Sequence, residues 1–445
     1  MKPVSNSPMP PTRHLAREIF LRTLASINIP AVMSEKLRFG ADRMVLLDAA
    51  LELPPGSRPL MIGIGKAAHA MASGLAALSP PGTAFEGVVT APTPPAAPIP
   101  GLAYFVGGHP IPNRDSWRSA EAVLRLLATC DARTVVFFLL SGGGSALIEL
   151  PLDASITLDD VQQVNQALVT CGAPIEAMNT VRRHLSAVKG GRLTLAAGPA
   201  AKVTIAVTDV PFGKESALAS GPTLPDPTTI ADVERVFAEY RLKERLPVSV
   251  RAWLDAKLMP ETPKSGHPAF ANAHFTLLLG MDDLFHAAHH SLEAQGYSCC
   301  CDNTTDDWPV EKAADYLLAQ LDSWQSENPG RPVAVIADGE LSSPVTGDGV
   351  GGRNSAFALS CVEKIAGRNV VVLSAGTDGI DGNSPAAGAV ADGSTLSRAR
   401  ALGLDPSAAR RQSNAFGFFE PLGDTIVTGP TGNNLRDLRV LMMAP

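Results

Sequence analysis

The sequence predicts an α/β fold made of two Rossmann-like domains with mainly parallel sheets and an inter-domain cleft for ligands. Apolar runs at 60–62, 135–140 and 203–207 each lead into a glycine-rich or polar loop. Such continuous runs are typical of strands that helices cover on both faces, as in a parallel sheet. The same alternation begins again after residue 270, so we expect a second sheet there. Ligands of these folds bind beyond the carboxyl ends of the strands, where the loops lie.

The individual elements follow from apolar spacing. Apolar residues at helical intervals predict helices, and short apolar runs bounded by turn residues predict strands. In chain order, we expect a helix over 15–27, a strand at 60–62 with an alanine-rich helix ending near Leu78, strands at 135–140, 203–207 and 274–279, a helix over 283–295, and strands at 332–337, 369–373 and 425–427.

Length and composition favour more than one domain. The chain has 445 residues, which suits two or three domains, and 45% of them are hydrophobic, which is enough for sizeable cores. The stretch 241–264 is charged, contains proline and holds no clear strand. We therefore place a boundary near residue 260, which gives domains of residues 1–260 and 261–445.

Charge and cysteine usage exclude several classes of protein. With a net charge of -7 and a pI of about 5.7, the chain is not expected to bind nucleic acid. The first 17 residues lack an apolar signal core, and no run approaches the roughly 20 apolar residues of a membrane span. The 6 cysteines form no CxxC pair and are expected to be free thiols. These features predict a cytoplasmic protein without a membrane partner.

Two glycine-rich loops in the first half favour an anionic ligand. Gly63-Ile64-Gly65-Lys66 opens a helix, where backbone N–H groups attract negative charge and Lys66 adds a positive charge. A tight turn with a solvated lysine is the alternative. The consecutive glycines of Ser141-Gly142-Gly143-Gly144-Ser145 allow the backbone to wrap a phosphate, or to make a plain sharp turn.

Two further candidates lie in the first half. Asn179 suits the N-cap of a helix that stops at Gly190, and Arg182 and Lys189 would share one face of that helix. Such cations can meet a phosphate or a substrate carboxylate, or can simply be solvated. Asp209 ends an apolar run, where a carboxylate can bind Mg²⁺, act as a base or cap a helix.

Arg353 and Asp378 are the best indication of phosphoryl chemistry. Arg353 follows the glycine-rich run 347–352, and twenty-five residues later Asp378 lies in Gly376-Thr377-Asp378-Gly379-Ile380-Asp381-Gly382. Arginine is the side chain best shaped for phosphate, and aspartate is a common ligand of Mg²⁺. A surface turn rich in Asp-Gly is the alternative for the second run.

Together these runs resemble the type II glycerate 2-kinases, the family whose C-terminal part is called MOFRL. The resemblance covers nearly the whole chain, in the family's order. The matching runs are 63–68, 107–112, 141–147, 179–186 with 189–191, 208–210, 219–223, 351–354, 376–382 and 427–432. Departures occur at Ser355-Ala356, where the family usually has Gln-Glu, at 413–416, and at 433–435 after the last motif glycine.

The resemblance implies phosphorylation of D-glycerate to 2-phosphoglycerate by ATP and Mg²⁺, with Lys66, Asp209, Arg353 and Asp378 in the site. Within that reaction we assign Lys66 and Arg353 to the transferring phosphate. Asp378 would hold Mg²⁺, and Asp209 would orient the 2-hydroxyl of glycerate. The nucleotide would be bound by Gly142, Gly143, Gly144, Ser145, Thr377 and Asp381, and the acceptor by Arg182 and Asn179.

Two other functions stay open at this point. Some members of the family are labelled hydroxypyruvate reductase, an activity that needs NADH or NADPH, but the dinucleotide fingerprint around Gly63 is incomplete. A non-catalytic sensor of sugar phosphates would bind its ligand without turnover. The sequence does not decide whether the chain forms a homo-oligomer.

Overall fold

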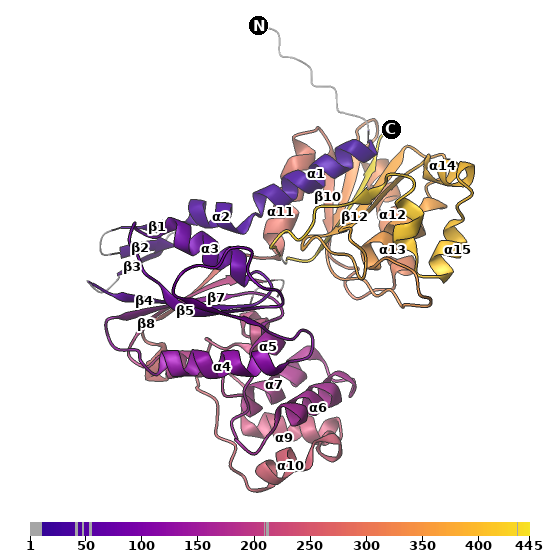
Figure 1. Ribbon diagram of the computed structural model, residues 1–445. Helices are drawn as coiled ribbons and strands as arrows, with labels where there is room; N and C mark the ends of the chain where they lie inside the picture. Colours follow the sequence, from indigo (N-terminus) through magenta and orange to yellow (C-terminus); the bar gives the residue numbers. More distant parts are fainter. Residues whose placement is uncertain are drawn as a thin grey trace. The chain divides into compact units, whose positions relative to one another are not determined.

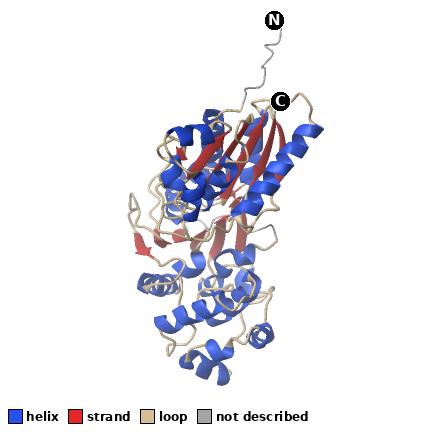
Figure 2. Ribbon diagram, turned by 90° about the vertical axis from the view of Figure 1, so that its right-hand side faces the viewer, coloured by secondary structure: helices blue, strands red, loops and turns tan. Residues whose placement is uncertain are grey.

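The computed structural model describes residues 11–40, 43–46, 49–52, 56–208, 210, 213–433 and 435–445. The chain forms two compact units. The N-terminal unit is Ile29–Gly280, and the C-terminal unit joins Met281–Pro445 to the segment that ends at Asn28. Each unit holds a six-stranded sheet with helices packed on it (Figures 1 and 2), which confirms the predicted α/β class and the two domains.

The sheet of the N-terminal unit is parallel in every described strand pair. Its order is β6-β5-β4-β7-β8-β9. The order reverses between β4 and β7, because β5 and β6 lie on one side of β4 and the later strands lie on the other. Open α/β sheets bind ligands at such a reversal. The strands are β4 (Arg58–Ile64), β5 (Glu86–Ala91), β6 (Leu102–Val106), β7 (Thr134–Leu140), β8 (Ala201–Val207) and β9 (Ala273–Leu279).

Helices cover both faces of this sheet. On one face lie α2 (Ile29–Lys36) and α3 (Ala68–Leu78), and on the other lies α4 (Arg114–Leu127) (Figure 1). Helix α3 buries Ala68, Met71, Ala72 and Leu75, the spacing of one helical face. Such two-sided cover explains why β4, β7 and β8 are almost continuously apolar and buried.

Four helices of the N-terminal unit pack on one another and form a core of their own. They are α6 (Leu158–Val169), α7 (Ile175–Leu185), α9 (Ile230–Glu239) and α10 (Val248–Asp255), and their shared core includes Val164, Val181, Val233 and Trp253. The remaining elements are the short helices α5 (Gly144–Leu147) and α8 (Arg192–Ala196), the 3₁₀ turns Glu215–Ser220, Lys243–Arg245 and Pro268–Phe270, and a small antiparallel sheet of β1 (Leu37–Phe39), β2 (Arg43–Leu46) and β3 (Ala49–Glu52).

The sheet of the C-terminal unit is mixed, so the prediction of a mainly parallel sheet is wrong here. Its order is β10-β11-β15-β12-β13-β14; β10 and β11 are parallel, and the other described pairs are antiparallel. Strand β15 lies between β11 and β12 and was not predicted. The strands are β10 (Ser298–Asp302), β11 (Val333–Ala337), β12 (Val370–Gly376), β13 (Gly388–Asp392), β14 (Thr425–Ile426) and β15 (Asp437–Met443).

Helices also cover both faces of the mixed sheet. Helices α1 (Arg13–Ser26) and α11 (Met281–Glu293) pack on one face, and α12 (Val310–Glu327) and α13 (Arg353–Val362) on the other (Figure 1). Three short helices follow β13, namely α14 (Thr395–Ala401), α15 (Pro406–Arg411) and α16 (Ala415–Phe419). Within the described residues, no helix is long and apolar enough to cross a membrane. All six cysteines are free, as predicted.

The division between the units falls at Gly280 rather than near residue 260. The predicted strand at 274–279 is part of β9, which pairs with β8 in the N-terminal sheet instead of starting the second domain. Conversely, α1 packs against α11 and belongs to the C-terminal unit. Both assignments depend on pairing between distant segments, which local composition does not reveal.

Candidate active site

The loops that follow β4 and β7 meet at the carboxyl edge of the N-terminal sheet. The backbone N–H of Lys66 donates to the carbonyl of Gly142 (2.9 Å), and that of Ala67 donates to Oγ of Ser141 (2.9 Å). Gly65 has a φ of +132°, and a Cβ at this position would lie 2.1 Å from Oγ of Ser141. Only glycine permits so close an approach. The structure thus brings together the two predicted anion loops at the reversal of strand order.

His109 lies beside Lys66 and the second glycine loop. Gly143 has a φ of +83°, and a Cβ there would lie 3.0 Å from Cδ2 of His109 and 3.4 Å from Cγ of Lys66. Partial burial and then the ammonium of Lys66 lower the pKa of His109, so its ring is neutral at pH 7. The sequence contained His109 in a matching run, but nothing local indicated its place beside Lys66.

Ser220 links two of the predicted ligand residues. The hydroxyls of Ser145 and Ser220 are 2.8 Å apart, and Ser220 donates to Oδ1 of Asn179 (3.0 Å). Ala219 and Ser220 have φ values of +50° and +60°, which costs on the order of 1–3 kcal/mol for each non-glycine residue. Strain of this kind is concentrated at functional sites. Ser220 is therefore a site candidate that residue type and spacing did not identify.

The predicted helix around Asn179 is placed differently in the structure. Helix α7 begins after Pro174 and ends at Leu185, so Asn179 lies in its buried interior and does not cap it. Lys189 lies beyond the helix, and the prediction that it shares a helical face with Arg182 is wrong. Arg182 donates from Nε to Oδ1 of Asn165 (3.2 Å) and is half-buried.

Lys189 is not available to a ligand. It is fully buried and forms an ion pair with Glu149, whose other carboxylate oxygen accepts from Oγ of Ser186 (2.6 Å). Lys189 also donates to the carbonyl of Ile148 (3.3 Å). The remaining candidate of this half, Asp209, lies outside the described residues; the strand before it, β8, ends at the same sheet edge as β4 and β7.

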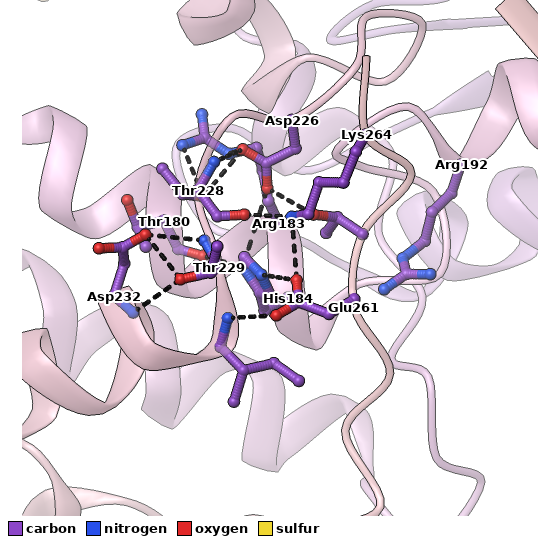
Figure 3. A network of polar contacts seen from close by, with 12 residues as sticks. Thr180, Arg183, His184, Arg192, Asp226, Thr228, Thr229, Asp232, Glu261 and Lys264 are labelled. Carbon is purple, nitrogen blue, oxygen red and sulfur yellow. Dashed lines mark hydrogen bonds and ion pairs between the residues drawn. The ribbon is translucent and has the colours of Figure 1, made fainter. Parts of the chain in front are cut away.

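A buried polar cluster adjoins α7 (Figure 3). The carboxylate of Asp226 is fully buried, forms an ion pair with Nε of Arg183 (3.0 Å), and accepts from Oγ of Thr228 (2.8 Å) and Oγ of Thr262 (3.0 Å). It thereby ties α7 to the loop before α9 and to the segment before β9. Because the cluster is buried and its groups contact one another, we infer that it supports the fold.

Arg353 is held by two carboxylates in the C-terminal unit. Its Nε donates to Oδ2 of Asp437 (2.5 Å) and its Nη1 to Oε2 of Glu340 (2.8 Å). Strand β11 ends, and antiparallel β15 begins, at the same sheet edge, which places Glu340 and Asp437 together. Burial opposes the charged form, but the two carboxylates outweigh it and raise the pKa of Arg353. Neither partner of Arg353 was predicted.

Asp381 and Thr377 hold the second predicted loop in place. Asp381 is buried and accepts from the backbone N–H groups of Asn354 and Ser355 (both 2.9 Å), so it caps the start of α13. Oγ of Thr377 donates to the carbonyl of Arg436 (2.7 Å). These contacts favour a structural role for both side chains, which the sequence assigned to the nucleotide.

Asp378 and Arg353 line one cavity of about 720 Å³ in the C-terminal unit. Asp378 is half-buried, and its Oδ1 accepts from the backbone N–H of Ile380 (3.0 Å). Asp381, Gly351 and Gly352 border the same space. The structure therefore brings together the guanidinium and the aspartate that the sequence singled out.

The C-terminal unit also holds a buried aspartate that the sequence did not indicate. Asp338 follows β11 and is fully buried, with Nη1 of Arg436 at 3.9 Å from its Oδ2. Desolvation raises its pKa to about 6, although Arg436 and the buried Arg439 oppose this shift. Arg439 donates to the carbonyls of Asp338 and Gly339.

Both halves of the chain match known families. Residues 15–255 match a domain of unknown function (DUF4147), and residues 333–437 match the MOFRL family. The chain is 33% identical to the D-glycerate 2-kinase of Thermotoga maritima, over 86% of this chain and 89% of that one. It is 36% identical to an Agrobacterium vitis protein with the provisional name hydroxypyruvate reductase, over 91% of each chain. A crystal structure of glycerate kinase from Thermotoga maritima matches with a TM-score of 0.83 and 31% identity, over 97% of this chain and 99% of that chain.

Proposed function

The chain belongs to the glycerate kinase family that carries the MOFRL domain, and on this premise we propose that it transfers the γ-phosphoryl group of ATP to the 2-hydroxyl of D-glycerate. The observation that supports the proposal most directly is that Arg353 and Asp378 line the same cavity. A guanidinium suits the oxygens of a phosphoryl group, and an aspartate beside it suits the accompanying cation.

The state of Arg353 supports its role at the phosphoryl group. Asp437 is nearly buried and holds the Nε side of the guanidinium, whereas Glu340 is half-exposed and binds Nη1. A phosphoryl oxygen can replace the solvated Glu340 without disturbing Asp437. Phosphoryl transfer proceeds through a loose transition state, so positioning and charge stabilisation supply most of the catalysis.

Lys66 and the glycine loop supply a second set of groups for anionic oxygens. Lys66 carries a mobile positive charge, and backbone N–H groups of residues 142–145 lie next to it at the reversal of strand order. His109 is neutral at pH 7 and adds no charge of its own. Its ring has one hydrogen-bond donor and one acceptor for a substrate. In the proposal, Lys66 and Arg353 act on the same phosphoryl group, Asp209 orients the 2-hydroxyl, and Arg182 and Asn179 serve the acceptor.

The side chains fit a Mg²⁺ ion that is held mainly by the nucleotide. Among the described residues, no group of three or more His, Cys, Asp or Glu side chains could hold a metal. Mg²⁺ commonly binds through one or two carboxylates together with phosphate oxygens and water, and Asp378 is the carboxylate that would hold it here. When bound, Mg²⁺ neutralises charge on the phosphates.

A coupled assay tests the reaction and the position of the new phosphate. The full chain is incubated with ATP, Mg²⁺ and D-glycerate, and enolase is added to convert 2-phosphoglycerate to an absorbing product. We expect a signal with enolase alone. If the signal requires a phosphoglycerate mutase as well, the phosphate is on the 3-hydroxyl and the assignment to the 2-hydroxyl is wrong.

The name of the Agrobacterium vitis relative keeps a reductase as the second candidate. Lys66 follows Gly63 and Gly65, but no acidic residue closes β5, where dinucleotide folds bind the ribose. We therefore expect no oxidation of NADH or NADPH by hydroxypyruvate. A steady loss of absorbance at the NADH band would reverse this preference.

A further inference from the structure

The cavity of about 720 Å³ in the C-terminal unit is much larger than the phosphoryl contacts of Arg353 and Asp378 require. Its volume is typical of pockets for ligands of nucleotide size, which occupy roughly 300–1,000 Å³. D-Glycerate is a small polar acid and would leave most of this space empty. The apolar part of the wall is formed by Val310, Leu341, Pro344, Val345, Leu359 and Ala409.

Two apolar side chains that border the cavity are exposed to solvent. Val345 is 82% exposed and Ile380 is 50% exposed, and both border the cavity. Single exposed apolar side chains are common in proteins, but two at the rim of one apolar pocket suit a flat ring that would cover them. Arg353 and Asp378 border the same cavity, so it offers charged groups together with apolar surface.

Hydrogen bonds between two loops keep the apolar wall in place. The N–H of Thr346 donates to Oγ of Ser413 (2.9 Å), and the N–H of Gly349 donates to the carbonyl of Gln412 (2.9 Å). The loops are so close that a Cβ on Gly349 would lie 2.4 Å from that carbonyl oxygen. The wall is therefore formed before a ligand enters, which lowers the entropic cost of binding.

We propose that this cavity binds the base and ribose of a purine nucleoside triphosphate, with the phosphates toward Arg353. An apolar ring attached to a polyanion matches a cavity whose lining combines apolar side chains with the guanidinium of Arg353. The inference rests on the proposed kinase function, because it names the place of the phosphoryl donor. It assigns the nucleoside to the C-terminal unit and leaves the residues around Lys66 to the phosphoryl group and the acceptor.

Two variants of the full chain test the assignment by binding. Val345→Asp places a carboxylate in the apolar rim at an exposed position, so folding should be unaffected. Ala356→Leu adds bulk at a half-exposed position of α13 that lines the cavity. Calorimetric titrations with ADP and, separately, with D-glycerate should show an ADP dissociation constant at least tenfold higher in both variants, with the constant for glycerate within twofold. Leu402→Asp, at a 56% exposed position away from the cavity lining, is the matched control and should change neither.

The other outcomes decide against the assignment. Weaker binding of glycerate with unchanged ADP affinity would make the cavity the acceptor site. Unchanged affinity for both probes, or no binding of ADP by the original chain, would remove the nucleoside from this cavity. Because the readout is binding, it is separate from the kinase assay. A chain that binds ADP in the expected way but does not phosphorylate glycerate would overturn only the proposed function.

Discussion

Loss of the negative charge at Asp226 is expected to destabilise the N-terminal unit by about 3–5 kcal/mol, the usual effect of breaking a buried ion pair. In Asp226→Asn the shape is kept, but the guanidinium of Arg183, whose side chain is 6% exposed, loses its counter-charge. Thr228 (Figure 3) also loses a charged acceptor. The same holds for Thr262. At about 2–4 °C per kcal/mol for a unit of this size, the unfolding temperature should fall by about 6–20 °C.

Scanning calorimetry of the full chain measures this shift, and hydrogen exchange shows which unit carries it. Faster exchange should be confined to the N-terminal unit and be largest in α7. Asp255→Asn is the matched control in the same unit, because Asp255 pairs with Lys243 at 2.6 Å while both side chains are more than half exposed. Such surface pairs contribute less than about 1 kcal/mol. Equal shifts for the two variants would refute the view that the Asp226 cluster supports the fold.

Three further changes have distinct expected results. Arg353→Ala should lower turnover by roughly 10³–10⁵ in the enolase-coupled assay, as for other arginines that stabilise a phosphoryl group, and near-normal turnover would contradict its role. Lys189→Met should lower stability in urea by about 3–5 kcal/mol because Glu149 stays buried without a partner, and adding Glu149→Gln should recover part of that loss. The pKa of Asp338 is about 6, above its usual value, so its contribution of about 3 kcal/mol to stability is present below about pH 4 and lost as the pH rises through 6. Urea titrations from pH 4 to 7 should show that slope, and Asp338→Asn should abolish it.

Local patterns were enough to predict the loops of the N-terminal unit. A buried strand, a glycine turn and a helix follow one another within a few residues around Lys66, and a strand and glycine turn do so before Ser145. Parallel neighbours end at the same edge, so β4 and β7 bring these loops together. The role of Ser220 depends instead on a backbone conformation that serine does not favour. That role therefore could not be inferred from the sequence.

The central strand of the C-terminal sheet shows what local patterns miss. Asp437 and Arg439 interrupt the apolar run of β15, yet both are buried because Arg353 pairs with one and backbone carbonyls bind the other. Those partners come from distant segments, so a local pattern could not predict this strand. The start of α7 was misplaced for another reason, since the Pro174 boundary was overlooked in favour of Asn179 as a cap.

The discontinuity of the C-terminal unit bears on the order in which the protein is made. Its first helix, α1, leaves the ribosome before any of the sheet it covers, whereas β15, which joins β11 to β12, is synthesised after the other strands of that sheet. The uninterrupted stretch Ile29–Gly280 can complete its fold during translation. Throughout that interval the apolar face of α1 has no native surface to cover, and chaperones that hold nascent chains have a ready target there.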